Sequence, residues 1–525
     1  MDLSAELARF TTDKTLPGWV PEAATRIVGE AQKSAHLAAE NQALAQQLKV
    51  AQLKTQALML ELAHHRRIRV GAKSEALSRE QIDLFIEAWE TDLAAIEAEV
   101  EKVLPAQPAK SPRARAGRQP LPDHLPRIDY RHEPLSCTCG QCGQALIKIG
   151  EDITEQLDIE PARFFVNRHS RPQFACRACE RIEAAPIPAA IIDGGMASSG
   201  LFAWLIISKY VEHLPLYRLA HIAARQGVSL SRSTLAEWVG RIGVALQPLV
   251  DRLVELLLLR GVLHADETPV AQLEPGSGKT KRAYLWVYRS NDLEQGPPIV
   301  VFDYQTSRSG AHARSFLEGW NGHLMVDDFA GYKALFGNDV IELGCLAHAR
   351  RKYYELHEAN QSPIAAEALR RIGALYAIER AGKDLGIEAR QQLRQCEAVP
   401  ALQALHEWLL DTQLSVALGT GTAKAIAYSV KRWDALSRYA QTGHLPIDNN
   451  PAENVIRPIA IGRKNWLHVG SERAGHRAAA IQTLMATAKL NGIEPYAWLK
   501  ETLEKLPTCP NSRIDELLPL RDRPT

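Results

Sequence analysis

The stretch Gly261-Val-Leu-His-Ala-Asp-Glu-Thr-Pro-Val270 decides how the rest of the sequence is interpreted. Because side chains alternate along a strand, Val262, His264 and Asp266 are expected on one face, with the intervening apolar residues on the other. The run is apolar enough for a buried central strand, and we expect regular pairing to stop at Pro269. A carboxylate in such a strand is costly unless it is paired, hydrogen-bonded or bound to a metal. Asp266 is therefore either a local cap near a strand end or one member of a group of converging acids.

Length and composition limit the kind of protein that this sequence can form. At 525 residues the chain is too long for one hydrophobic core, so several domains are expected. The hydrophobic fraction of 46% and charged fraction of 23% are ordinary for a soluble globular protein. The net charge is only +1, so binding to nucleic acid must depend on local basic patches. There is neither an apolar run of about 18 residues nor a signal-peptide pattern, which indicates a cytoplasmic protein with no membrane partner.

Residues 1–104 are interpreted as a helical, coiled-coil region. A heptad seam with alternating spacings of four and three runs through Leu37, Asn41, Leu44, Leu48, Ala51, Thr55, Leu58 and Leu62. After an interruption at Gly71 and Ser74, a second helix would align Ile82, Phe85, Trp89, Leu93, Ile96 and Val100. The seam favours a homo-oligomer formed through the coiled coil. The alternative is a helical hairpin that packs on its own domain.

Residues 105–131 are rich in proline and basic residues and show no periodicity, which is typical of a linker. Arg113, Arg115 and Arg118 could touch phosphates, although a solvated basic linker is the commoner explanation of such a run.

Five cysteines between residues 137 and 179 indicate metal ligation in a reducing compartment rather than a disulfide framework. They lie in a predicted zinc-binding module, residues 132–188, in which four thiolates can close tetrahedrally around one structural Zn²⁺. Only one quartet has two-residue gaps on both sides, and its members are the expected ligands: Cys139, Cys142, Cys176 and Cys179. Cys137 is a spare or an alternative ligand.

Residues 189–259 return to a helical pattern. Within them, residues 219–239 resemble a helix-turn-helix with its turn at Gln226-Gly227-Val228. That turn is about two residues longer than the tight DNA-reading form. A plain helical pair that packs beside the next domain is the alternative.

Residues 260–358 change to a mixed pattern. Strands are expected at 261–267, 282–288, 299–304, 323–327 and 340–345, and helices near 311–319, 329–336 and 346–358. Three sequential strands followed by alternating helices and strands fit a mixed sheet with helices on its faces. The run Gly276-Ser-Gly-Lys-Thr280 resembles a P-loop, but Leu273 stands where that motif needs glycine. A hairpin loop is expected there instead.

The last part of the chain is predicted to be mainly helical. Residues 359–445 have no strand pattern and are interpreted as an all-helical insertion. Residues 446–504 would complete the sheet domain and end in a helix. Residues 505–525 are expected to be a poorly ordered tail.

Three acidic residues, Asp266, Asp327 and Glu453, are candidates for one site. If the first and fourth strands are neighbours, Asp266 and Asp327 can face each other, and a helix across the sheet edge could bring Glu453. Clustered carboxylates are tolerated when they bind divalent cations, and their hard oxygen ligands suit two Mg²⁺ or Mn²⁺ ions. Each acid also has a simpler interpretation: Asp327, or Asp328 beside it, can cap the following helix, and Glu453 with Asn450 has the spacing of a capping pair.

Basic residues follow these acids and favour a catalytic interpretation. They are His348, Arg350, Arg351, Lys352, Arg457, Arg463 and Lys464. Acids that hold metal, surrounded by guanidinium and ammonium groups, suit the phosphate backbone of double-stranded DNA.

Several motifs resemble those of bacterial transposases of the insertion sequence 66 family. They are His264-Ala-Asp266-Glu-Thr-Pro, the run from Met325-Val-Asp327 to Gly331-Tyr332, Cys345-Leu-Ala-His348-Ala-Arg-Arg-Lys352, Asp448-Asn-Asn-Pro-Ala-Glu453, Ile461-Gly-Arg-Lys-Asn-Trp466 and Ala488-Lys-Leu-Asn-Gly492. The resemblance covers nearly the whole chain. It implies a multidomain α+β protein with a ribonuclease-H-like α/β catalytic core and an Asp-Asp-Glu triad with two magnesium ions. Asp266, Asp327 and Glu453 are the matching positions.

The resemblance also implies a function. Such enzymes nick DNA at the ends of a mobile element and join the freed 3′ hydroxyls to target DNA. The coiled coil would make the protein oligomeric, the zinc module would help to bind the element ends, and accessory proteins of the same element are possible partners. A bacterial, nucleoid-associated location follows.

Two departures from the family pattern matter. The family usually has glycine after the second aspartate, where this chain has Asp328, so the two aspartates could exchange roles. It often has arginine after the glutamate, where this chain has Asn454, and Arg457 one turn later can supply that charge. The alternative functions are a non-catalytic, zinc-containing DNA-binding protein and a metal-dependent nuclease that does not join strands. The presence of all three acids argues against the first.

Overall fold

The computed structural model describes residues 17, 19–70, 90–100, 121–133, 137–138, 141–160, 163–192, 194–274, 279–337 and 339–521. The chain divides into two compact units. The first consists of residues 1–70 and 96–117, and the second of residues 71–95 and 118–525.

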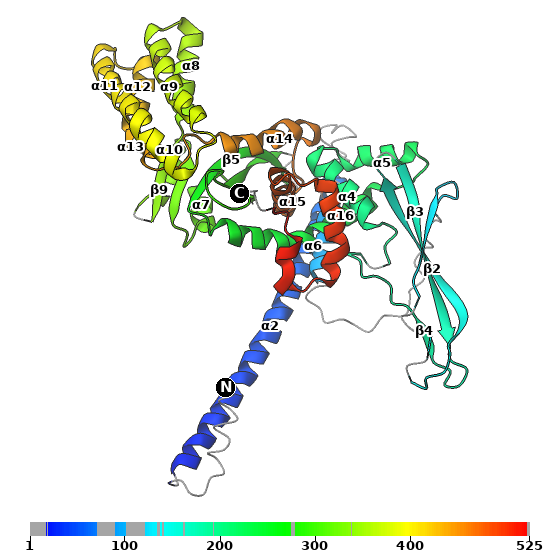
Figure 1. Cartoon of the computed structure of the whole chain (residues 1–525). Helices are drawn as coiled ribbons and strands as arrows, with labels where there is room; N and C mark the ends of the chain where they lie inside the picture. Colours follow the sequence, from blue (N-terminus) through cyan, green and yellow to red (C-terminus); the bar gives the residue numbers. More distant parts are fainter. Residues whose placement is uncertain are drawn as a thin grey trace. The chain divides into compact units, whose positions relative to one another are not determined.

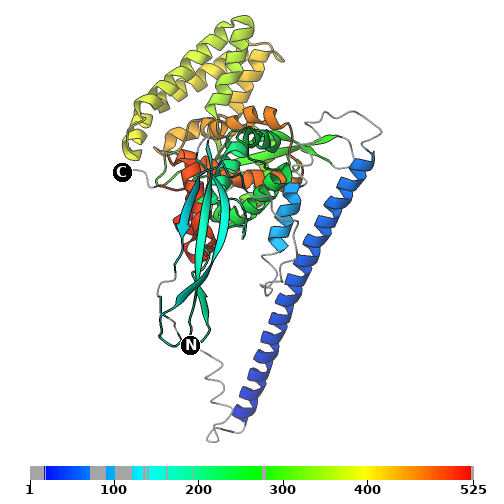
Figure 2. The ribbon, with the colours of Figure 1, turned by 90° about the vertical axis from the view of Figure 1, so that its right-hand side faces the viewer.

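The first unit is dominated by α2 (Trp19–Val70), a continuous helix of 52 residues (Figure 2). Four leucines of the expected heptad seam leave more than half of their surface exposed on it: Leu37, Leu44, Leu48 and Leu58. A seam of this kind is normally buried against a partner helix. Residues 90–100 are also helical and bury Ile96, whereas Ile82, Phe85 and Trp89 of the expected second helix lie outside the described residues. Self-association through the seam stays a prediction.

A sheet of four strands precedes the central domain. Its strands are β1 (Arg127–Arg131), β2 (Ile147–Glu160), β3 (Arg163–Ala175) and β4 (Ile182–Ala184). The antiparallel β2 and β3 form a long hairpin (Figure 2), β1 pairs with β3 in parallel, and β4 pairs with β3.

The linker prediction for residues 105–131 is wrong over its last part. Leu121 and Leu125 are buried, and β1 is part of the sheet. The Arg127 guanidinium explains why this proline-rich segment is ordered, because it donates hydrogen bonds to the carbonyls of Leu121, Pro122, Asp123 and Leu125. Residues 105–120, with the three arginines at 113, 115 and 118, lie outside the described residues.

Helices connect this sheet to the central domain. They are α4 (Ser199–Ile206), the π-helix η1 (Ile207–Val211), α5 (Leu216–Arg225) and α6 (Arg232–Leu257). Residues 235, 236, 238 and 239 in the first turns of α6 are buried. A DNA-reading helix must present exposed side chains to the groove. Ser233 and Glu237 on the other side of the same turns are exposed, so the helix-turn-helix and the plain helical pair both stay predictions.

The central sheet has the strand order β7-β6-β5-β8-β9. Its strands are β5 (Val262–Leu273), β6 (Thr280–Ser290), β7 (Val300–Gln305), β8 (Gly322–Val326) and β9 (Val340–Gly344). The first three form an antiparallel meander, and β8 and β9 are added in parallel. The predicted mixed sheet is confirmed, including the adjacency of its first and fourth strands.

The expectation that pairing stops at Pro269 is wrong. Pro269 pairs with Tyr284, and β5 continues against β6 as far as Leu273. The parallel ladder with β8 extends only over residues 262–264. Proline is tolerated because it lies where the second edge of β5 has no strand partner. The expected hairpin is present, since Leu273 pairs with Thr280, although residues 275–278 lie outside the described residues.

Helices cover both faces of this sheet. On one face, a core that includes Leu263 and Trp286 joins the sheet to α6, α7 (Gly310–Phe316) and the 3₁₀ helix η2 (Ala330–Leu335). On the other face, Val270 and Val287 belong to a core shared with α14 (Asn450–Trp466) and α15 (Glu472–Leu490). The alternation predicted for β5 therefore assigns Asp266 to the face of α14.

A block of helices lies between β9 and α14 in sequence (Figure 1). It contains α8 (Leu346–Asn360), α9 (Pro363–Ala381), α10 (Ile387–Leu393), the π-helix η3 (Arg394–Ala398), α11 (Val399–Ser415), α12 (Gly421–Lys431), α13 (Trp433–Ser437) and the 3₁₀ helix η4 (Arg438–Gln441). The block has its own hydrophobic core, with Leu375 and Ile426 fully buried. The same core includes Met325 and Leu343 of the sheet, which anchor the block to β8 and β9.

The prediction of a poorly ordered tail at 505–525 is wrong for residues 505–521. After α16 (Pro495–Lys505), the chain forms the 3₁₀ helices η5 (Leu506–Thr508) and η6 (Asn511–Leu517). Leu517 and Leu518 are buried in the main core, and the Trp498 indole donates to the Leu517 carbonyl. The prolines of this segment predicted disorder, although its apolar residues are numerous enough to pack. Residues 522–525 lie outside the described residues.

Among the helices within these described ranges, none is both long and apolar enough to traverse a membrane.

Candidate active site and zinc centre

Asp266 lies in the middle of β5 with its side chain largely withdrawn from water. Its carboxylate accepts a 2.8 Å hydrogen bond from the backbone N–H of Glu267. Burial raises the pKa of Asp266 to about 8, and the charges of Glu267, Asp327 and Glu453 add to this effect. The backbone hydrogen bond opposes the shift without cancelling it. Asp266 is thus a carboxyl group for which the described residues supply no compensating positive charge, which is the condition under which a cation is expected.

Asp327 and Asp328 occupy different environments at the end of β8. Asp327 is half-buried, accepts a 2.8 Å hydrogen bond from the Phe329 N–H, and contributes to the pKa shift of Asp266. Asp328 is exposed and pairs with Lys333 at 3.0 Å and with Arg432 at 3.5 Å. The charge of Asp328 is therefore already compensated. These contacts favour Asp327 as the second acid of the site.

Asn449 anchors the beginning of α14 to the strand that carries Asp266. This fully buried side chain donates a 2.8 Å hydrogen bond from Nδ2 to the Ala265 carbonyl, and its Oδ1 lies 3.1 Å from His264 Nδ1. Burial lowers the pKa of His264 to about 4, so its imidazole is neutral. Asn449 is also the N-cap residue of α14, so the Asn450–Glu453 capping pair considered from the sequence is not formed. The tether places Glu453 one turn into α14, within electrostatic reach of Asp266.

Glu453 is held by two basic residues of α8. His348 Nδ1 lies 3.6 Å from Oε1, and Arg351 Nη2 donates to Oε2 at 3.3 Å. Of the remaining basic candidates, Arg350 lies over the Tyr354 ring at 5.9 Å and Lys352 over the Tyr428 ring at 4.4 Å. Arg463 donates to the Pro269 carbonyl of β5. Arg457 and Lys464 are exposed on α14.

The three acids are brought to one region but not into a closed cluster. Across the described part of the chain, the cysteine group at Cys142, Cys176 and Cys179 is the one set of at least three potential ligand side chains whose ligand atoms all lie within 4.8 Å of one another. The carboxylates fit divalent cations through their oxygen chemistry and the raised pKa of Asp266. Cation binding would have to draw them closer together.

Glu267 was not singled out in the sequence, although it lies beside Asp266. It points to the opposite face of the sheet, where its side chain is 1% exposed. It accepts hydrogen bonds from Arg308 Nε at 2.8 Å and from the Tyr332 hydroxyl at 2.9 Å. The Arg308 guanidinium lies 3.8 Å from the centre of the Phe329 ring. Since the Phe329 N–H binds Asp327, this network links β5 to the loop that carries the second acid. The feature of the sequence that could have indicated Glu267 is the presence of two adjacent acids in an apolar strand.

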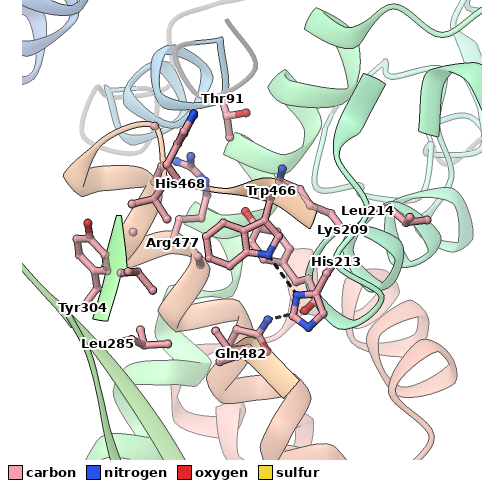
Figure 3. A pocket seen from close by; sticks show the side chains of 18 residues that line it. Thr91, Lys209, His213, Leu214, Leu285, Tyr304, Trp466, His468, Arg477 and Gln482 are labelled. Atoms are coloured by element: carbon pink, nitrogen blue, oxygen red, sulfur yellow. Dashed lines mark hydrogen bonds between the residues drawn. The ribbon is translucent and has the colours of Figure 1, made fainter. Parts of the chain in front are cut away.

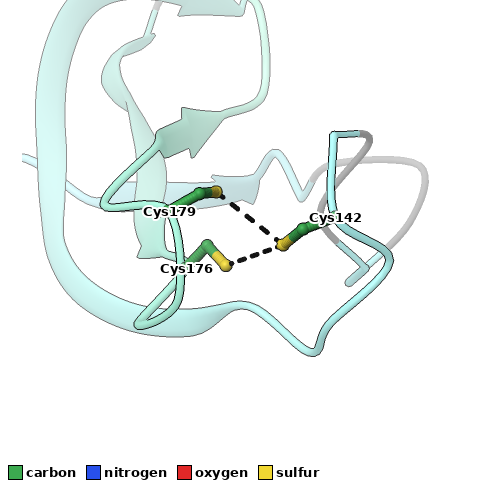
Figure 4. Close-up of side chains that lie close together, drawn as sticks. All are labelled: Cys142, Cys176 and Cys179. Carbon is green, nitrogen blue, oxygen red and sulfur yellow. Dashed lines mark hydrogen bonds between the residues drawn. The ribbon is translucent and has the colours of Figure 1, made fainter.

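The zinc centre brings together three of the four predicted ligands (Figure 4). Cys142 Sγ lies 3.3 Å from Cys176 Sγ and 3.8 Å from Cys179 Sγ. Zn–S bonds of about 2.3 Å in a tetrahedron separate the sulfurs by about 3.8 Å, so the three thiols fit one Zn²⁺. The fourth predicted ligand, Cys139, lies outside the described residues, and the alternative Cys137 is exposed.

Comparison with known proteins agrees with this arrangement. The model described as "Transposase IS66 family" matches residues 194–477, more than half of the chain. The chain belongs to the IS66 transposase family. The "IS66 C-terminal element" matches residues 483–520, the "zinc-finger binding domain of transposase IS66" residues 136–180, and "Transposase C of IS166 homeodomain" residues 57–129.

Similar proteins include y4jD and y4qI of Sinorhizobium fredii (strain NBRC 101917 / NGR234), both described as uncharacterized and each 36% identical to this chain. The match to y4jD covers 88% of this chain and 94% of the relative, and that to y4qI covers 87% of each. The family match identifies a transposase with a zinc-binding domain, and it supports binding to DNA and a divalent metal. The matched zinc-finger segment contains all the cysteines assigned above to the zinc centre.

Proposed function

We propose that this transposase cleaves the ends of an insertion sequence and joins their 3′ hydroxyls to target DNA by two-metal phosphoryl transfer. The observation that carries the proposal is the environment of Asp266, a half-buried acid whose pKa is raised by desolvation and by neighbouring carboxylates that include Asp327 and Glu453. The strand order, with a three-stranded meander extended by two parallel strands, supports a ribonuclease-H-like core.

In this proposal Asp266, Asp327 and Glu453 hold two divalent cations, Mg²⁺ or Mn²⁺. The chemistry that such a pair supplies when bound is stabilisation of the attacking and leaving oxygens of an in-line displacement. In the first reaction, water attacks the phosphorus and the bond to the 3′ oxygen of the element breaks. In the second, the freed 3′ hydroxyl attacks a target phosphodiester, and the target's 3′ oxygen leaves.

The remaining residues of the site would bind and orient DNA. Arg351 now pairs with Glu453, but about half of its side chain is exposed, so its guanidinium is within reach of solvent and of a DNA phosphate. Arg457 and Lys464 extend the positive charge along α14. We further propose that a homo-oligomer assembled through α2 holds the two element ends, with the zinc-bearing sheet contributing to their recognition. Accessory proteins of the same element and a nucleoid-associated location belong to the same proposal.

Substitution of Asp266 by Asn tests the proposal directly. The variant keeps the size of the side chain but removes the charge that a cation requires, so cleavage and strand transfer should be lost while DNA binding survives. Oligonucleotides that carry the element ends, incubated with Mg²⁺, provide the assay. Asp328→Asn is the matched control and should retain most activity, because Asp328 is already paired with Lys333 and Arg432.

The possible outcomes separate the alternatives. Unchanged strand transfer by Asp266→Asn would refute the catalytic assignment. A wild-type protein that binds the ends but neither cuts nor joins them would indicate the non-catalytic DNA-binding protein. Cutting without joining would indicate a nuclease. Loss of activity in Asp328→Asn, but not in Asp327→Asn, would exchange the roles of the two aspartates.

A further inference from the structure

A cavity lies beside Trp466 (Figure 3), the last residue of α14. Its volume is about 100 Å³, and it opens to solvent. Ring side chains share its wall with two cationic side chains, of which Arg477 is already paired with Asp92: Tyr210, His213, Tyr304, Trp466 and His468, with Lys209 and Arg477. Among the described residues that line it there is no aspartate or glutamate. Its chemistry therefore suits a flat ring attached to a negatively charged group.

The wall is built on two strained backbone segments. The π-helix η1 leads into His213, which has φ +60° although it is not glycine. After Trp466, Leu467 has φ +61° and ψ −46°, and the His468 N–H donates to the Trp466 carbonyl at 2.7 Å. This geometry approximates a classic γ-turn, which is rare and costly. Strain of this kind persists at sites where the surrounding structure enforces it, and it often marks function.

Glycines let the rings approach the helices closely. A Cβ at Gly462 of α14 would lie 2.1 Å from the His213 ring, and one at Gly475 of α15 would lie 2.4 Å from the Tyr304 ring. The Trp466 indole N–H donates to His213 Nδ1 at 3.4 Å (Figure 3). Arg477 Nη2 lies 2.9 Å from Asp92 Oδ1 and forms an ion pair with it. The side chains of the wall are thus fixed by packing and by hydrogen bonds before any ligand binds.

The cavity lies on the same side of the sheet as Asp266. Val270, which lines it, is four residues beyond Asp266 on β5 and so faces the same way, about 13 Å along the strand. Along α14, Trp466 is about 20 Å from Glu453. Between these points, Arg463 reaches back to β5. At about 3.4 Å for each nucleotide, this separation corresponds to roughly four to six stacked nucleotides.

We propose that this cavity receives one unpaired base of the DNA strand that is cut at Asp266, a role that rests on the proposed function. The base stacks among the rings, with Trp466 as the main partner, and its phosphate lies toward Lys209. Removing a base from a duplex requires loss of pairing and stacking, which a stacking surface offsets. The cavity thereby fixes the register of the strand relative to the acids.

A photocrosslinking scan tests where the bases lie. In duplexes that carry the element end, 5-iodouracil replaces one base at a time over six positions on each side of the cleavage junction, and the wild-type protein is irradiated in EDTA. Crosslinks to Trp466, Tyr304 or His213 from a single position, identified by mass spectrometry, are expected. The proposal would be overturned if all crosslinks mapped to other parts of the protein. It would also be overturned if no crosslink formed with DNA that the protein binds and later cuts.

A second experiment tests whether the cavity promotes cleavage by holding the base. Trp466→Ala should reduce cleavage of intact ends about 10- to 100-fold, the range expected for one lost stacking partner. An abasic nucleotide at the crosslinked position should bring the variant to within about threefold of wild type on the same DNA, because no base then needs a partner. A purely structural defect would persist on abasic DNA, and that result would contradict the proposal.

Controls separate this inference from the proposed function. Trp408→Ala, in α11 and remote from the cavity lining, should leave cleavage and crosslinking unchanged. Trp466→Phe keeps an aromatic ring and should retain the crosslink. This variant provides the test if the alanine variant fails to fold. Asp266→Asn should lose cleavage but keep the crosslink. Crosslinking without cleavage by the wild type would contradict the proposed function alone, and cleavage without crosslinking would contradict the base-binding cavity alone.

Discussion

At the scale of single residues, Asp266 and Glu267 show how one strand can serve two purposes. Asp266 faces α14 and has no compensating positive partner within the described part of the chain, whereas Glu267 faces the opposite side and is satisfied by Arg308 and Tyr332. The first arrangement suits a site that awaits a cation. The second suits a support that holds the loop of Asp327 in place, and its effect on the reaction can be measured separately from folding.

Glu267→Gln should therefore lower the turnover number for strand transfer about tenfold or more while leaving the KM for DNA nearly unchanged. The variant removes the charge that holds Arg308, and with it the packing of Phe329 beside Asp327. Loss of this buried charged hydrogen bond should also lower the free energy of unfolding by about 1–3 kcal/mol. Glu379→Gln, which alters an acid paired with the buried Arg394 in the helical block, is the control. An equal fall in turnover in both variants would refute a specific positioning role for Glu267.

Much of this residue-scale picture followed from alternation along β5, because strand geometry is local. The alternation assigned Val262, His264 and Asp266 to one face. The hydrophobic cores agree, because Val262 belongs to a different core from the apolar residues that follow it on the other face. The roles of Asn449 and Glu267 could not be predicted, because they depend on partners distant in sequence: Ala265 for the first, and Arg308 and Tyr332 for the second. No periodic pattern encodes such pairs.

At the scale of elements, α14 and the zinc-bearing sheet are each held by a few contacts. Asn449 ties α14 to β5, and Cys142, Cys176 and Cys179 hold the ends of the β2–β3 hairpin region together. The sequence predicted most of these elements but misjudged the ends of several. The pairing at Pro269, the order of the last part of the linker and the order of the tail could not be predicted, because proline content does not show which partners a segment meets in the fold. In the structure, pairing with β6 continues through Pro269, hydrogen bonds from an arginine order the last part of the linker, and buried leucines order the tail.

Asn449→Ala should leave the sheet folded but allow the beginning of α14 to move relative to Asp266. A displacement of about 1 Å at a catalytic group can reduce a rate about 100-fold, so strand transfer should fall by that order while DNA binding is retained. Asn450→Ala removes the side-chain hydrogen bond to Asp448 and serves as the matched control. Comparable rates in the two variants would show that the tether does not position Glu453.

Cys176→Ser should release zinc and loosen the sheet around residues 130–185. Because structural zinc binding is coupled to folding, loss of one thiolate is expected to abolish tight binding. Metal content measured by mass spectrometry and cleavage by a protease give the two readouts. The control variant Cys396→Ser changes an exposed cysteine of η3, and the protein should retain its zinc. Full zinc stoichiometry in Cys176→Ser would contradict the ligand assignment.

At the scale of the whole molecule, α2 presents an apolar seam that a single chain leaves exposed. The double variant Leu44→Glu with Leu48→Glu places charges in that seam and should convert an oligomer into a monomer, as measured by light scattering after size-exclusion chromatography. Gln46→Glu with Gln47→Glu adds the same charge outside the seam and should not change the mass. A monomeric wild-type protein, or an oligomer that survives both changes, would favour the helical-hairpin interpretation.

The helical block between β9 and α14 also has a consequence for the timing of synthesis. Glu453 is made 126 residues after Asp327 (453 − 327). At about 5–20 residues per second, a growing chain spends about 6 to 25 s with two of the three acids but without the third. During that interval the zinc-bearing sheet and much of the central sheet already exist as polypeptide. Under the proposed function, a nascent or prematurely ended chain therefore has the parts that engage DNA before it has the third acid that cutting requires.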